Sequence, residues 1–143
     1  KAEMRCEAML ADSTQRKNLW NRYLDPENKT SLHMLMESWL GFRSSLRYNE
    51  EDEKLFFEAV PKIFSLGKHP QFCRNFFLYL FPHGDNLEYY HKELSQLSEK
   101  AKQSGDPAFI KAVGESLDDV ERKKRCYACC AKDILRLSFN INI

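Results

Sequence analysis

The segment RYLDPENKTSLHMLMESWLGF, Arg22 to Phe42, carries the clearest local signals of the fold. One predicted helix ends at Leu24, because Pro26 pushes the residue before it out of the helical region. Thr30 or Ser31 can then cap a second helix. The apolar residues of that helix recur every three or four positions, as expected for one buried face: Leu32, Leu35, Met36, Trp39, Leu40 and Leu46. The segment therefore predicts two helices joined by a short polar turn.

The same periodicity continues along the chain, and no alternating run of the kind typical of a strand interrupts it. Polar, glycine or proline residues punctuate the pattern at Asp12-Ser13, Tyr48–Asp52, Leu66–Lys68, Pro82–Gly84 and Ser104–Pro107. These breaks predict an all-α fold, a compact bundle of about six to nine helices.

Two of the breaks predict specific helix starts. Asp85 followed three residues later by Glu88 resembles a capping box. Asp106 is expected to cap the last helix, with Pro107 at its first position. The final pattern runs from Phe109 to Ile134 and is either one long helix or two helices broken near Gly114.

Composition limits the function classes. The chain has 143 residues, 43% of them hydrophobic, which suits a single domain over residues 1–143, excised from a larger protein. Its formal net charge of +1 gives no field that would attract nucleic acid or anionic lipid. No apolar run reaches the length of about 18 residues that a membrane span needs. We therefore expect no nucleic acid as partner, no membrane span, and a cytoplasmic location.

Five cysteines are present, three of them in CYACC, Cys126 to Cys130. An odd number suits reduced thiols inside the cell. Cys126 and Cys129 have half the spacing of a zinc site, and only His69 and Cys73 could supply the other half. The alternative is that these cysteines pack as small apolar residues. No nucleophile, phosphate or metalloprotease motif occurs, so we expect no catalysis, no metal and no cofactor.

Residues Met9 to Phe42 resemble the opening half of a regulator-of-G-protein-signalling (RGS) domain. A helix ends there in an aromatic residue and a leucine, a polar loop contains Glu27-Asn28, and an apolar helix follows. Later, LSEKAKQSGDPAFIKAV, Leu97 to Val113, resembles the turn before the last helices of that family, with Asp106 in its acidic joint.

This resemblance implies binding to a G-protein α subunit, whose switch segments the family holds in their transition-state shape. The chain departs from the family in several places. The loop after Leu24 is one residue short, Leu35 replaces a common tryptophan, and the loop Ser65–Gln71 has no asparagine. No arginine follows Asp106 at the usual position. The fold can persist without these contacts while the activity is lost, so the GTPase-activating function is doubtful.

The leading hypothesis is a non-enzymatic protein–protein interaction domain, with Glu27, Asn28 and Asp106 on its contact rim. The structural alternative is that Asp106 only caps a helix and the other two only decorate a turn. A second hypothesis is a helical segment of a large intracellular scaffold, whose interface would include Phe76, Phe77 and Tyr79. A third is a zinc-stabilised helical module.

Overall fold

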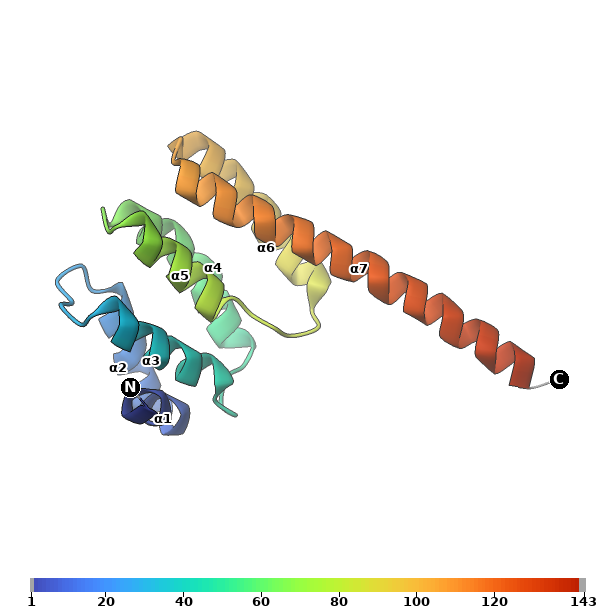
Figure 1. Ribbon diagram of the computed structural model, residues 1–143, viewed down its shortest axis with the longest axis horizontal. Coiled ribbons are helices and arrows are strands. Elements are labelled where there is room, and N and C mark those ends of the chain that lie inside the picture. The colour runs from blue at the N-terminus through green and yellow to red at the C-terminus, as the bar shows by residue number, and fades with distance from the viewer. Residues whose placement is uncertain (1, 142–143) are drawn as a thin grey trace. The chain divides into compact units, whose positions relative to one another are not determined.

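The structure, a computed structural model, describes residues 2–141, with side chains to residue 138 (Figure 1). It contains seven helices: α1 (Ala2–Leu10), α2 (Ser13–Leu24), α3 (Leu32–Ser44), α4 (Glu50–Ser65), α5 (Pro70–Leu80), α6 (Leu87–Ser104) and α7 (Pro107–Ile141). No strand occurs among these described residues, which confirms the predicted all-α fold.

The helices form two compact units. The first comprises Lys1–His83 with Pro107–Phe109, and the second comprises Gly84–Asp106 with Ile110–Ile143. Helices α1 to α5 therefore belong to the first unit, whereas α6 and nearly all of α7 belong to the second.

Local capping sets the helix starts in the first unit. Asp12 accepts a hydrogen bond from the backbone N–H of Gln15, whose side chain in turn accepts one from the N–H of Asp12. Asn49 and Asp52 form the same reciprocal box at the start of α4. Each box satisfies backbone N–H groups that have no partner within the helix. Pro61 lies inside α4 without ending it.

An aromatic cluster fills the core of the first unit. Trp39 and Phe76 are fully buried with ring centroids 5.6 Å apart, and Phe42 stacks on Trp20 at 5.7 Å. Phe77 is also fully buried. The expectation that Phe76 and Phe77 form an interface is therefore wrong, because this unit uses both rings in its own core.

Arg16 is a charged residue inside this apolar unit, with only 6% of its surface exposed. Its guanidinium donates to the carboxylate of Asp52 at 2.9 Å and to the carbonyl of Phe42 at 3.3 Å. The same group lies 3.9 Å from the centroid of the Phe42 ring. A buried cation needs such partners, and these contacts link α2 to α3 and α4.

Helix α1 packs closely on α3 at Gly41. A Cβ atom at Gly41 would lie 2.1 Å from the carbonyl oxygen of Arg5. The Arg5 side chain forms an ion pair with Glu37 of α3 at 2.6 Å, and Arg47 donates to the carbonyl of Ala11 at 2.7 Å. Glycine is therefore required where the two backbones meet.

The second unit is an antiparallel pair of helices. Gly105, at φ 70°, ends α6 in the left-handed conformation and reverses the chain. Lys124 pairs with Glu88 at 2.9 Å, and Glu121 lies 3.3 Å from His91. The start of α6 thus lies beside the middle of α7. The buried side chains of the pair are Leu87, Tyr90, Leu94, Leu97, Ala101, Ala112, Val113 and Val120.

One sequence expectation needs correction in this unit, and one open alternative is decided. The N-cap of α6 is Asn86, without a side-chain cap, rather than a box of Asp85 and Glu88. The carboxylate of Glu88 instead forms an ion pair with Lys124 and so links α6 to α7. Gly114 does not break the last helix, which runs without interruption through it.

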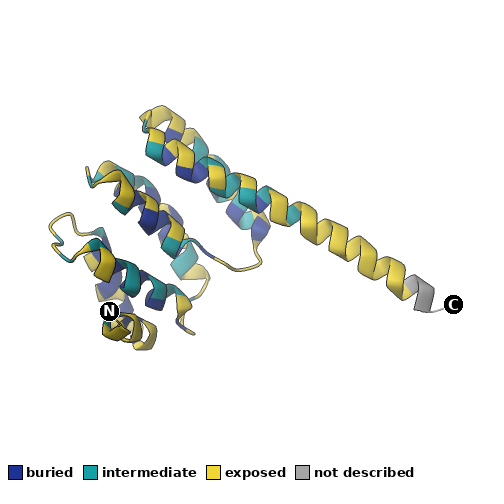
Figure 2. Ribbon diagram, in the orientation of Figure 1, coloured by how far each residue is buried: buried dark blue, intermediate teal, exposed yellow. Residues whose placement is uncertain are grey.

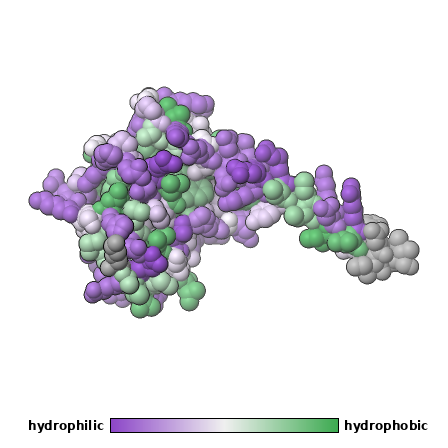
Figure 3. Space-filling view, viewed as in Figure 1, coloured by the Kyte–Doolittle hydropathy of each residue, from purple (hydrophilic) through white to green (hydrophobic). Residues whose placement is uncertain are grey.

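Helix α7 is much longer than its partner. Residues 125–138 are all exposed, whereas earlier residues of the helix alternate between buried and exposed (Figure 2). Hydrophobic side chains lie along this exposed part (Figure 3), including Tyr127, Ile134, Leu135 and Leu137.

Substitution of Gly41 by alanine should destabilise the first unit by about 1–3 kcal/mol, because the new methyl group meets backbone rather than a side chain that can move. Gly114→Ala is the matched control: nothing lies within 4 Å, and alanine should gain about 0.5–1 kcal/mol in a helix. Urea unfolding followed by tryptophan fluorescence and circular dichroism measures both. Equal effects of the two substitutions would contradict the close approach.

Arg16→Met should cost about 3–5 kcal/mol, because it leaves the carboxylate of Asp52 without its cation in a largely buried place. The double variant R16M/D52L should recover much of that loss, apart from about 1 kcal/mol for the lost cap. Glu99→Ala, which breaks an exposed ion pair with Lys102, should cost at most about 1 kcal/mol. A double variant that only adds the two single losses would argue against a coupled pair.

Candidate interaction surface

The loop between α2 and α3, which holds Glu27 and Asn28, is braced by its own side chains. The amide of Asn28 donates to the carbonyl of Arg22 at 3.0 Å and accepts from the N–H of Thr30 at 3.0 Å. Asp25 accepts from the N–H of Glu27 at 2.9 Å. Both ends of the Asn28 amide therefore hold the loop backbone in place.

The ends of the loop are also fixed. Asp25 caps the C-terminus of α2 through its backbone N–H, and Ser31 caps α3 by accepting from the N–H of Met34. Glu27 is exposed between these caps. The structure thus gives Asn28 a structural role and leaves the carboxylate of Glu27 at the surface. Whether either residue touches a partner stays a prediction.

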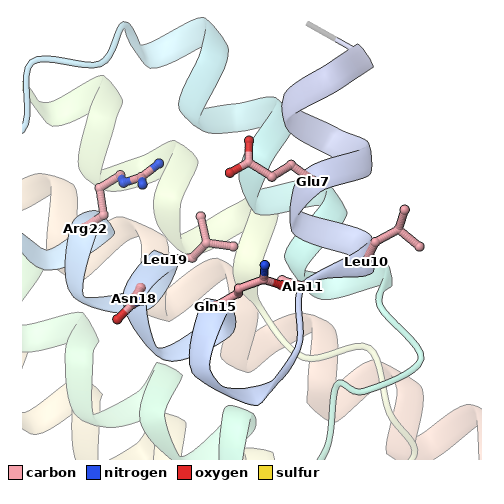
Figure 4. A pocket seen from close by; sticks show the side chains of 7 residues that line it. All are labelled: Glu7, Leu10, Ala11, Gln15, Asn18, Leu19 and Arg22. Carbon is pink, nitrogen blue, oxygen red and sulfur yellow. The ribbon is translucent and has the colours of Figure 1, made fainter.

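A groove of about 380 Å³ lies between α1 and α2, beside this loop (Figure 4). Its floor is the buried pair Ala11 and Leu19. Glu7 of α1 and Arg22 of α2 point toward one another across Leu19. The amide of Asn28 donates to the backbone carbonyl of Arg22, so the loop contacts a residue that lines the groove. The remaining lining residues are Leu10, Gln15 and Asn18.

The chemistry of this groove is that of recognition. A carboxylate and a guanidinium face each other over an apolar floor, which can hold a side chain with both polar and apolar parts. Tyr23 lies in the core beside Arg22, and burial raises the pKa of its hydroxyl to about 12, so this group is neutral at physiological pH.

The sequence pattern does not predict this groove. Its one signal was Leu10, an apolar residue at the end of α1 that is 77% exposed. A groove arises from the angle between two helices, and periodicity within one helix does not contain that angle.

Asp106 belongs to the second unit and lies directly before Pro107, the first residue of α7, as predicted. Its carbonyl accepts from the N–H of Ile110 at 3.0 Å, and its own N–H donates to the hydroxyl of Ser104 at 3.2 Å. This position at the helix start agrees with the structural alternative for Asp106. A contact role for this residue stays a prediction.

The cysteine cluster does not form a metal site in the part of the chain that is described. No group of three histidine, cysteine, aspartate or glutamate side chains there could hold a metal ion. Cys126, Cys129 and Cys130 are exposed on α7. His69 and Cys73 have other contacts, because the His69 ring caps α5 and the buried Cys73 thiol lies 3.5 Å from the carbonyl of Ile63.

Comparison of the chain with protein-family models, with curated proteins and with solved structures finds no match. Within residues 2–141, no helix is both long and apolar enough to cross a membrane.

Asn28→Ala should destabilise the loop by about 1–2 kcal/mol, because it removes two hydrogen bonds to backbone groups. Hydrogen exchange at the amide of Thr30 should accelerate, while exchange in α5 stays unchanged. Glu27→Ala is the control, since loss of an exposed carboxylate should change stability by less than about 0.5 kcal/mol. Unchanged exchange in the Asn28→Ala variant would show that the loop is held by other contacts.

Proposed function

We propose that this chain is a non-enzymatic protein–protein interaction domain that presents the α2–α3 loop and the neighbouring α1–α2 groove to a protein partner. The observation that carries the proposal is the bracing of the loop by Asn28. A loop that is already ordered before binding loses less conformational entropy on binding, so more of its contact energy becomes affinity.

A G-protein α subunit is the partner class that the RGS-like sequence suggests. Two features support a charged, polar contact of this kind: the exposed carboxylate of Glu27 and the facing charges of Glu7 and Arg22. The contact loop itself is one residue shorter than in the family, whereas the departures at Leu35 and in the loop Ser65–Gln71 lie elsewhere. Binding and acceleration of GTP hydrolysis are therefore separable properties.

The experiment is a pull-down of purified Gα subunits by the whole chain. Binding should be strongest when Gα carries GDP with aluminium fluoride, which mimics the transition state of hydrolysis, and weaker with GDP alone. Glu27→Lys should weaken binding at least tenfold by reversing the charge on the loop. Glu58→Lys, the same change at an exposed position of α4, should leave binding unchanged.

Failure of the wild-type chain to bind any of these forms removes the G-protein function. Single-turnover GTP hydrolysis with the same proteins separates binding from activation, and we expect the hydrolysis rate to stay close to that of Gα alone.

A second candidate function, a helical segment of a scaffold, is supported by a different observation. Four large apolar side chains of α7 are 58% to 63% exposed: Tyr127, Ile134, Leu135 and Leu137. Such a stripe on a helix is typical of a surface that another helix covers.

A further inference from the structure

The apolar face of α7 continues past the helix that covers it. Within the second unit, the start of α6 lies beside Lys124. The covered part uses Val113, Leu117 and Val120 at spacings of four and three, and the same rhythm continues in the exposed part. Its members beyond Lys124 are Tyr127, Ala131, Ile134 and Ser138, flanked by Ala128, Cys130, Leu135 and Leu137.

These eight residues, which we call the distal stripe, occupy one side of the exposed part of α7. With about 100° per residue, the basic side chains Arg122, Arg125, Lys132 and Arg136 fall on the opposite side. The stripe itself carries no charged residue. An apolar side opposite a basic side suits either a partner helix or an anionic membrane surface, so the side-chain volumes of the stripe decide the choice of occupant.

We propose that the occupant is the distal stripe of a second copy of this chain, paired in antiparallel orientation. The stripe contains four small residues and four large ones, and an antiparallel pair places a small residue opposite a large one at every position. Ala131 faces Ile134, Tyr127 faces Ser138, Ala128 faces Leu135, and Cys130 faces Leu137.

Such pairing fills the seam without voids, since small residues let the backbones approach and large ones fill the remaining space. A parallel pair would instead place each residue opposite its own copy. Ile134 would then crowd Ile134, while Ala131 opposite Ala131 would leave a gap. A parallel seam extended toward α6 would also bring the two Lys124 ammonium groups together, which costs free energy.

The area is sufficient for a weak but specific dimer. Each copy exposes four large side chains at 58% to 63%, so two copies would bury about 1,000 Å², the lower limit of a specific interface. The uncovered part of α7 is about 25 Å long, and a helix of that length is marginal in water without a partner. Association of the distal stripes would therefore also stabilise the helix.

Sedimentation equilibrium of the whole chain under reducing conditions tests association. We expect a monomer–dimer equilibrium with a dissociation constant of about 10 µM. Ile134→Asp should weaken the dimer at least tenfold, because it puts a carboxylate in the seam. Cys129→Asp is the matched control, since it introduces the same charge on the basic side of α7 and should leave the dimer intact.

A mixing experiment tests the orientation. A131E and I134K should each be monomeric alone, because in a homodimer of either variant both new charges would face an apolar residue of the other copy. Mixed in equal amounts, they should form a heterodimer in the antiparallel arrangement, in which the two new charges meet once and the second pair remains Ala131 with Ile134. A mixture of A131E with I134E should stay monomeric.

Three results would overturn the proposal. The first is a wild-type chain that remains monomeric at 200 µM, including a chain that then binds phosphatidylserine-rich vesicles in a flotation assay. The second is a dimer that Ile134→Asp leaves intact while circular dichroism shows a folded chain. The third is failure of the A131E and I134K mixture to associate. Retention of the dimer by Cys129→Asp and association of that mixture would support it.

Discussion

The guanidinium of Arg16 joins three helices of the first unit at one point. It starts on α2, bonds to the Asp52 carboxylate at the start of α4, and lies over the ring of Phe42 on α3 while donating to that residue's carbonyl. An unpaired cation in this place would be very costly. The buried cation is therefore tolerated only when all three helices are in position. This requirement favours the observed placement of α2, α3 and α4 over other placements.

Phe42 connects this contact with the aromatic core. Its ring stacks on Trp20 and lies 5.9 Å from Tyr23 edge to face, so the residue under the cation is also central to the packing. Tyr23 in turn hydrogen-bonds to Ser38 of α3. Since α2 and α3 are fixed to each other along this line, the loop between them spans two rigid ends. The packing of α2 on α3 fixes the two ends of the loop, and the hydrogen bonds of Asn28 fix its middle.

Local features of the fold could be predicted from the sequence, because proline, glycine and caps act on neighbouring residues. The end of α2 before Pro26, the stop at Gly67 and the start of α7 at Pro107 were all predicted. Long-range features could not. Arg16 stands between polar residues and reads as exposed, and nothing beside Gly41 in the sequence reveals the carbonyl of Arg5.

The same distinction applies to the candidate site. The sequence identified the exposed Glu27, but the groove between α1 and α2 depends on how two helices cross. At the start of α6, by contrast, the sequence predicts a feature that the structure does not contain. Asp85 and Glu88 have the spacing of a capping box, yet Glu88 bonds to a lysine 36 positions further along the chain. The predicted box does not form because Asn86, rather than Asp85, stands at the N-cap of α6.

The cysteines of α7 have one interpretation in the sequence and another on the helix. As CYACC they resemble half of a metal site, because spacing along the chain is the only available measure. On the helix, Cys129 lies on the basic side, while Cys130 lies among the apolar residues that continue the stripe covered by α6. Cysteine is close to alanine in size and apolar in character. Cys130 therefore fits the distal stripe as a small apolar residue, and its small volume rather than its thiol matters for the proposed pairing.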